Sequence, residues 1–190
     1  MAERNVQADY VIWAVTFRVT GNDLAALYQK AQDQSEEIRQ FLVNQGIKAE
    51  DISSGTPNVQ DLHADFYGNN LPPERYRMEM AVSVATTDVG TVLKAMSRQS
   101  ELIQKGVLFT QNYRTQFSFN GLNEIKPAMV EEATKNARST AQKFAEDSES
   151  TLGKIRRASQ GQFTIYDRDS NTPYVKRVRV VTTVEYYLKD

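Results

Sequence analysis

Apolar and polar side chains alternate along two stretches of the chain, over residues 10–20 and 76–84. An alternation with a period of two is typical of a β-strand that buries one face. We therefore predict a half-buried strand over each stretch, with the first strand starting at Tyr10, because residues 1–8 are polar. The apolar positions are Val11, Trp13, Val15, Phe17 and Val19 in the first stretch and Tyr76, Met78, Met80, Val82 and Val84 in the second.

Each predicted strand is followed by a segment with helical spacing of its apolar residues. The spacing predicts helices over residues 24–45 and 87–105, and a glycine follows each of them. Extended segments then cover residues 47–59 and 107–119. A strand–helix–strand unit thus occurs twice, and neither unit is long enough to bury its own sheet face. We predict that the two units share one antiparallel sheet.

A third, longer helix is predicted from about Asn123 to Glu149, with Pro127 in its first turn, where a missing N–H group costs little. Residues four apart lie on one face of a helix, so a stripe of alanines in this segment forms a smooth seam. We assign the seam to packing against the sheet of the same chain, although its flank would also suit a neighbouring subunit. The stripe consists of Ala133, Ala137, Ala141 and Ala145.

The chain closes with two extended segments, residues 154–166 and 174–188, on either side of a polar turn over residues 168–173. This pattern predicts a C-terminal hairpin. No linker or low-complexity segment divides the chain. We therefore predict one α+β domain over residues 1–190, made of the two strand–helix–strand units, the long helix and the hairpin.

Composition excludes several classes of function. The 190 residues carry a net charge of −1 without a strongly basic block, which argues against nucleic-acid binding. The absence of cysteine removes disulfides, thiol catalysis and zinc–cysteine sites. A single histidine, His63, excludes catalytic sets that need two. No segment approaches the roughly 18 apolar residues that span a membrane, and no secretory signal precedes the first predicted strand.

Three segments carry a family resemblance. They are Val6-Gln7-Ala8-Asp9 with the following Ile12-Trp13, the helix end from Phe41 to Ile47, and Leu152-Gly153-Lys154-Ile155 after the alanine helix. In this order they resemble the SIMPL-domain family (DUF541), bacterial envelope proteins of unknown function. The resemblance implies an α+β fold with helices against an antiparallel sheet.

The resemblance also implies a periplasmic location, or a membrane anchor that leaves the domain facing the periplasm. Similar members carry a hydrophobic segment and a short strand-forming stretch just before the position of Val6, and we expect this sequence to lack both, so that any membrane contact would run through a missing N-terminal segment. One relative assembles into a large ring-like oligomer, and the family is linked to oxidative-stress tolerance. No catalytic residues are accepted for the family.

We therefore expect a non-enzymatic envelope protein that uses no cofactor and self-associates or scaffolds other proteins. The alternative is a small-ligand binding module that uses a cleft between the sheet and its helices.

Two groups of residues invite a metal-site interpretation. Asp61, His63 and Asp65 alternate, so their side chains point to one side of an extended chain, but we favour the alternative of a polar loop edge and predict no metal there. Asp167 and Asp169 begin a stretch like a calcium loop, but that loop requires Gly at its sixth position and Glu at its twelfth. Those positions hold Thr172 and Val178, so we predict a hairpin turn and no metal.

Two surface features are candidates for interaction. A cationic, anion-facing stripe would arise if the strands that carry Arg156, Arg157, Arg177 and Arg179 pair, and the alternative is a solvated face balanced by neighbouring carboxylates. The loop over residues 61–74 keeps apolar residues that suit a contact with another subunit, or that fold back on their own sheet. These residues are Leu62, Phe66, Tyr67 and Leu71.

Overall fold

The computed structural model describes residues 1–64, 70–110 and 115–189. The chain forms two units, each with its own internal packing. Unit 1 combines Met1–Asp9 with Ser118–Asp190, and unit 2 is Tyr10–Phe117. The mixture of helices and antiparallel strands confirms the α+β class.

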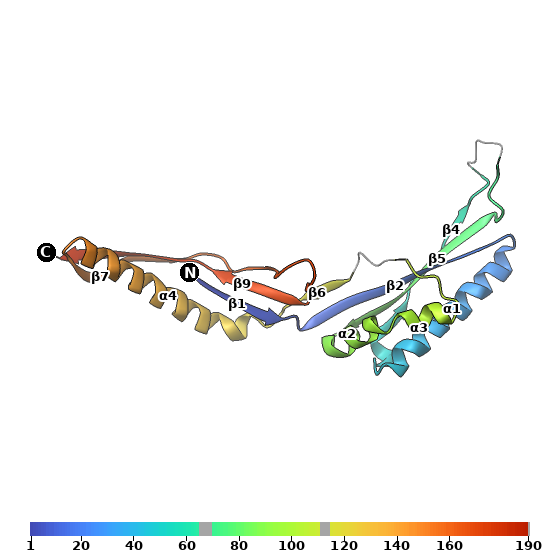
Figure 1. The fold of residues 1–190 in the computed structure, drawn as a ribbon, viewed down its shortest axis with the longest axis horizontal. Coiled ribbons are helices and arrows are strands. Elements are labelled where there is room, and N and C mark those ends of the chain that lie inside the picture. The colour runs from blue at the N-terminus through green and yellow to red at the C-terminus, as the bar shows by residue number, and fades with distance from the viewer. Residues whose placement is uncertain (65–69, 111–114, 190) are drawn as a thin grey trace. The chain divides into compact units, whose positions relative to one another are not determined.

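Unit 2 is one antiparallel sheet with its helices on one face (Figure 1). The strands run in the order β3-β5-β2-β6, and β4 also pairs with β5. Both predicted strand–helix–strand units contribute to this sheet, which confirms the shared sheet. The elements are β2 (Tyr10–Gly21), α1 (Leu24–Asn44), the 3-10 helix η1 (Ala49–Asp51), β3 (Ile52–Ser54), β4 (Asn58–Asp61), β5 (Tyr76–Thr86), α2 (Val89–Ser97), α3 (Ser100–Gln104) and β6 (Gln116–Ser118).

The apolar faces of β2 and β5 form the centre of the unit 2 core. Val15 lies opposite Val82 in the antiparallel register, and Trp13 and Phe17 beside it on β2 are fully buried. Asp23 accepts a hydrogen bond from the N–H of Ala26 at 2.8 Å and thereby caps α1. This cap fixes the start of the helix that covers the sheet.

The helix predicted over residues 87–105 is two helices, α2 and α3. Ser97, the last residue of α2, donates its hydroxyl to the carbonyl of Lys94 at 2.7 Å. Such a side chain competes with the helical hydrogen bonds of the main chain. The extended segment predicted over residues 107–119 is also shorter, because its only described strand is β6, and residues 111–114 lie outside the described part of the chain.

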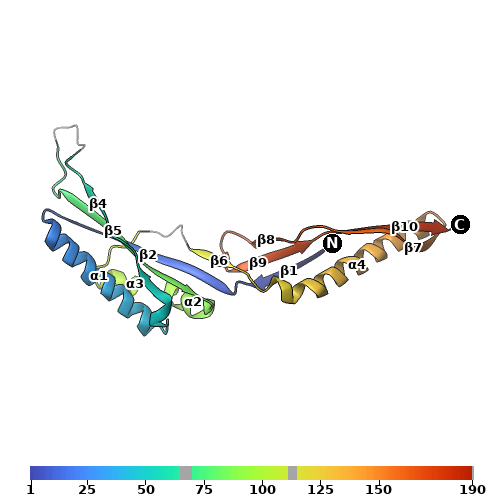
Figure 2. The same ribbon diagram turned by 180° about the vertical axis from the view of Figure 1, so that it is seen from behind.

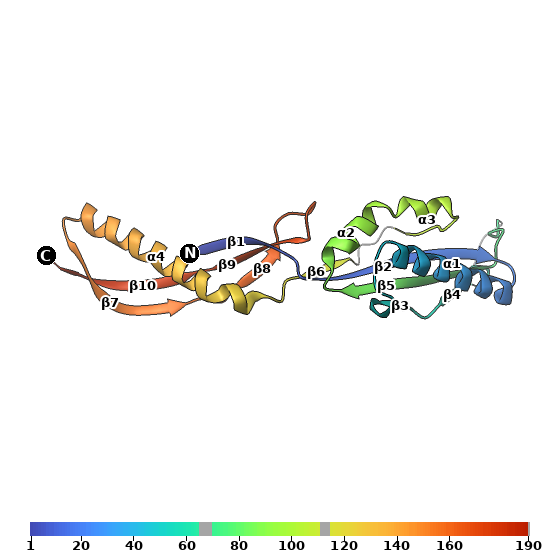
Figure 3. The same cartoon turned by 90° about the horizontal axis from the view of Figure 1, so that it is seen from below.

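Unit 1 places one long helix, α4, against antiparallel strands (Figures 2 and 3). Strands β1, β9 and β8 form one sheet in that order, and β10 pairs with β7. Only Val181 separates β9 from β10, so the two form a nearly continuous strand. The elements are β1 (Ala2–Gln7), α4 (Leu122–Asp147), β7 (Thr151–Gln160), β8 (Thr164–Asp167), β9 (Val175–Val180) and β10 (Thr182–Lys189).

Strand β1 corrects two expectations. The first strand starts at Ala2 and not at Tyr10, and a strand-forming stretch does precede Val6. Strand β1 pairs antiparallel with β9, with Ala2 opposite Val180. Its polar side chains conceal it in the sequence, because an edge strand is held by main-chain hydrogen bonds and needs few apolar residues.

The alanine seam of α4 packs on its own unit, as assigned. Ala133 and Ala145 are buried, and Ala137 and Ala141 are half-buried. Because α4 begins at Leu122, Pro127 lies in its second turn and not in its first.

Asp9 binds the turn that leads into α4. Gly121 at the helix start has no side chain to offer, but the Asp9 carboxylate accepts the N–H groups of Asn120 at 2.8 Å and of Gly121 at 2.8 Å. The N–H of Asp9 in turn donates to the carbonyl of Ser118 at 2.9 Å. The motif that ends at Asp9 therefore joins β1 to the start of α4.

We expect Asp9→Ala to lower the free energy of unfolding of unit 1 by about 1 to 1.5 kcal/mol, because two N–H groups of the turn before α4 lose their acceptor. Asp9→Asn keeps one carbonyl oxygen and should lose roughly half as much. Urea unfolding followed by circular dichroism measures both changes. Equal losses for the two variants would show that the hydrogen bonds to Asp9 do not matter.

Candidate interaction surface

The β7–β10 ribbon forms the end of unit 1 that β1 does not reach (Figure 3). It pairs antiparallel, from Thr182 opposite Gln160 to Lys189 opposite Thr151. The register shifts twice, and each time the extra residue lies in β7. Helix α4 covers one face of the ribbon (Figure 1).

Gly153 makes the second of these bulges possible. A Cβ atom at this position would lie 2.6 Å from the carbonyl oxygen of Tyr187, which is closer than side chains approach main-chain atoms. Glycine thus allows β7 to bend toward β10. The bulge therefore accounts for the glycine in the Leu152-Gly153 pair after the alanine helix.

Large apolar side chains are exposed on this ribbon and on the last turns of α4. The exposed fraction is 52% for Ile155, 57% for Leu188 and 70% for Phe144. Exposed apolar side chains that lie close together are typical of a surface that contacts another protein.

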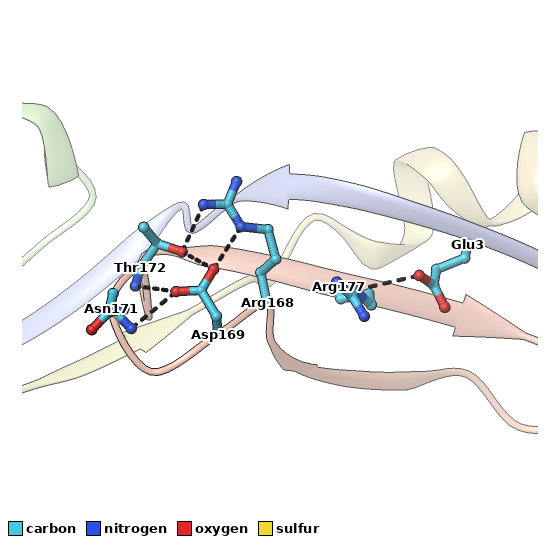
Figure 4. A network of polar contacts seen from close by, with 6 residues as sticks. All are labelled: Glu3, Arg168, Asp169, Asn171, Thr172 and Arg177. Atoms are coloured by element: carbon cyan, nitrogen blue, oxygen red, sulfur yellow. Dashed lines mark hydrogen bonds and ion pairs between the residues drawn. The ribbon is translucent and has the colours of Figure 1, made fainter.

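The four arginines of the predicted cationic stripe fall on two separate strand pairs. Arg156 and Arg157 lie on β7, where Arg157 is opposite Glu185 of β10. Arg177 and Arg179 lie on β9, which pairs with β1 and β8 and not with β7. The Nε atom of Arg177 is 3.3 Å from the Glu3 carboxylate (Figure 4). The Glu3 carboxylate thus pairs with one of the four arginines, and anion binding by this stripe stays a prediction.

The turn between β8 and β9 is closed by hydrogen bonds to Asp169 (Figure 4). Its carboxylate accepts the N–H groups of Asn171 and Thr172 at 2.9 and 2.8 Å and the Arg168 Nε–H at 2.9 Å. Hydrogen bonds from Thr172 and from the Arg168 guanidinium hold the pKa of the Asp169 carboxyl well below its usual range. The carboxylate is occupied by the turn itself, in agreement with the predicted hairpin turn.

The apolar loop over residues 61–74 joins β4 to β5. Leu62 is half-buried, and its N–H donates to the carbonyl of Arg75 at 2.7 Å, whereas Leu71 is 59% exposed. Phe66 and Tyr67 lie outside the described residues. The predicted contact role of this loop therefore rests here on Leu62 and Leu71.

The metal interpretation of the same loop has little support. The Arg75 guanidinium lies 2.9 Å from the Asp61 carboxylate and lowers the pKa of that carboxyl. The Nε2 atom of His63 is 2.8 Å from the carbonyl of Pro72, and Asp65 lies outside the described residues. Among the residues that the structure does describe, no group of three acidic or histidine side chains is placed to hold a metal ion.

Unit 2 contains a cavity of about 290 Å³ at one end of its sheet. It lies between the segment that follows α1 and the junction of β5 with α2. The carboxylate of Asp88 at this junction accepts hydrogen bonds from the N–H and the hydroxyl of Thr91, at 3.0 and 2.7 Å. The lining residues are Tyr10, Gly46, Ile47, Lys48, Asp51, Ala85, Thr86, Thr87, Asp88 and Thr91.

The SIMPL family model, described as "Protein of unknown function (DUF541)", matches residues 1–186. The chain belongs to the SIMPL family. The matched residues include both units, so the family model covers unit 1 as well as unit 2. No curated protein matches the chain.

The SIMPL segments recognised in the sequence have structural roles in this chain. Asp9 binds the turn that leads into α4, and Gly153 permits the bulge against Tyr187. No helix in the described part of the chain has the length and apolar character needed to cross a membrane. Sequence reasoning missed the exposed apolar side chains of the β7–β10 ribbon, among them Ile155 and Leu188.

Proposed function

We propose that this SIMPL protein is a non-enzymatic component of the bacterial cell envelope that self-associates or scaffolds other proteins. The periplasmic or membrane-anchored location and a role in stress tolerance extend the family resemblance to this chain. Self-association rests on a separate observation, the exposed apolar surface of unit 1.

That surface supports association because folding leaves it uncovered. Ile155 and Leu188 are each more than half exposed on strands whose outer edges have no partner among the described residues. Helix α4 covers one face of this two-stranded ribbon and leaves these side chains exposed. Covering it with a second protein removes apolar area from water and satisfies its main-chain groups.

Light scattering on the purified chain over a wide concentration range tests the proposal. We expect a mass of at least two chains, and a strict monomer at every concentration would refute self-association. Leu62→Ala with Leu71→Ala should reduce the assembled fraction if the β4–β5 loop also contributes. Asn58→Ala on the exposed part of β4 is the matched control and should leave the mass unchanged.

The second candidate function, a small-ligand binding module, is favoured by the cavity of unit 2. Its size of about 290 Å³ is close to the lower limit for ligand pockets. Lys48 and the Thr86–Asp88 segment give it polar groups that fix a ligand's orientation. A thermal-shift screen detects such a ligand, because binding to the folded state alone raises the melting temperature.

A further inference from the structure

The sheet of unit 2 has a face that points away from its helices (Figure 1). Helices α1 and α2 pack on the face that carries the buried apolar side chains of β2 and β5. Successive side chains of a strand point to opposite faces, so Arg18 of β2 and Arg77 and Glu79 of β5 lie on the other face. Arg18 is directly opposite Glu79, and Arg77 is the next residue of β5 on this face. The two arginines therefore occupy neighbouring positions of one sheet surface.

A hollow of about 170 Å³ lies among these side chains. Strand β4 borders it, because Asn58 is paired opposite Glu79 and Gln60 opposite Arg77. The hollow is lined by Arg18, Asn58, Gln60, Arg77 and Glu79, all of them polar or charged. A protein-binding surface usually has a more apolar centre, so this lining favours a small, water-soluble ligand.

The chain itself does not satisfy the two arginines of the hollow. The Nε–H groups of Arg18 and Arg77 are shielded from water and donate to no acceptor among the described residues. Arg18 has a loose ion pair, with its Nη2 atom 3.4 Å from the Glu79 carboxylate, and Arg77 makes no ion pair with the described residues. A shielded N–H group without an acceptor is unfavourable. A small rotation of either guanidinium toward an acceptor in the hollow would therefore be stabilising.

The charge of the lining indicates which acceptor fits. Two guanidinium groups and one carboxylate leave the hollow with a single excess positive charge. A carboxylate balances that charge, and its two oxygens match the parallel N–H groups of a guanidinium. A phosphate monoester carries about two negative charges at neutral pH, so it would place an excess negative charge beside Glu79. The amides of Asn58 and Gln60 offer donors and acceptors to a hydroxyl group of the same ligand.

We propose that this hollow binds the carboxylate of a small hydroxy acid between Arg18 and Arg77, with the amides of Asn58 and Gln60 orienting its hydroxyl group. The lone pairs of a carboxylate accept about four hydrogen bonds, so both guanidinium groups can bind it at once. The site goes beyond the proposed self-association, and it shares no residue with the cavity between β5 and α2.

Titration of the full chain with sodium lactate, followed by nitrogen-15 NMR, tests the site. Shielding from water slows the exchange of the Nε–H protons, so Arg18 and Arg77 should give signals of their own. We expect lactate to shift both signals until they saturate. Lactamide, which resembles lactate but has no charge, and sodium chloride at equal ionic strength should leave them in place. Equal shifts with lactate and chloride would overturn the site, and tighter binding of phosphate than of lactate would overturn the choice of ligand.

Variants of Arg77 test the geometry of binding, with the Arg18 signal as the reporter. Arg77→Lys keeps the charge but loses the two parallel N–H groups, so lactate should bind about tenfold more weakly. Arg77→Gln removes the charge as well and should abolish the shift. The indole signal of Trp13, which is buried in the core of unit 2, shows that each variant is folded. Wild-type affinity in a folded Arg77→Gln variant would refute the proposal.

Glu79→Gln separates binding from loss of structure, because it should improve binding. Without the carboxylate, the positive charge of the hollow rises by one and Arg18 loses its competing partner. We expect lactate to bind about threefold more tightly, and phosphate to gain more than lactate does. Glu36→Gln makes the same charge change on an exposed position of α1 and should leave both affinities unchanged. A Glu79→Gln variant that binds lactate no better than the wild type would contradict the assignment of this hollow to an anion.

Discussion

Met129→Ala will lower the free energy of unfolding of unit 1 by about 3 kcal/mol. Met129 lies on α4 and is fully buried against Val178 and Val180 of β9 and Ala2 of β1. It is the largest fully buried side chain of this cluster. Its removal leaves a cavity between helix and sheet that the small neighbouring side chains cannot fill.

Hydrogen exchange of the β9 amides measures this effect directly in unit 1. A loss of about 3 kcal/mol corresponds to exchange faster by roughly a hundredfold where those amides exchange through unfolding. Met129→Leu is the control, because it keeps the side-chain volume and should cost less than about 1.5 kcal/mol. Equal exchange rates in the alanine variant and the wild type would mean that Met129 does not hold α4 on the sheet. Trp13, the only tryptophan, belongs to unit 2, so its fluorescence does not report on this core.

The sequence predicts the parts of the fold in which periodicity reflects burial. Strands β2 and β5 alternate clearly because one face lies under α1 and α2, and the long helix and the C-terminal hairpin follow from their spacing and turn residues. Strand β1 escaped prediction because only Ala2 and Val6 mark its inner face. Its place is set by main-chain pairing with β9, which no local pattern encodes.

The candidate contacts were harder to predict than the fold. The exposure of Leu71 agrees with an interaction loop, but the exposed apolar side chains of the β7–β10 ribbon depend on how the strands pair in the folded chain. The arginine stripe needed β7 beside β9, and the strand order places β10 beside β7 instead. Which strands become edges is decided by tertiary pairing, so a sequence pattern alone could not assign either surface.

Ala133→Leu should destabilise unit 1 by about 2 to 3 kcal/mol, although leucine forms helices almost as well as alanine. Ala133 is completely buried in the seam between α4 and its sheet. Three added carbon atoms must push the helix away from β1 and β9 or take a strained rotamer, because no space adjoins a side chain packed on all sides.

Ala128→Leu on an exposed position of the same helix provides the matched control, and we expect its effect to stay within about 0.5 kcal/mol. Urea unfolding of both variants followed by circular dichroism gives the difference. If the Ala133 variant were as stable as the Ala128 variant, the space between α4 and its sheet would accommodate a leucine side chain. Alanine would then not be needed there for close packing. A large difference would agree with the close packing of the alanine stripe inside unit 1, and the β7–β10 ribbon and the β4–β5 loop would remain the candidate surfaces for a partner.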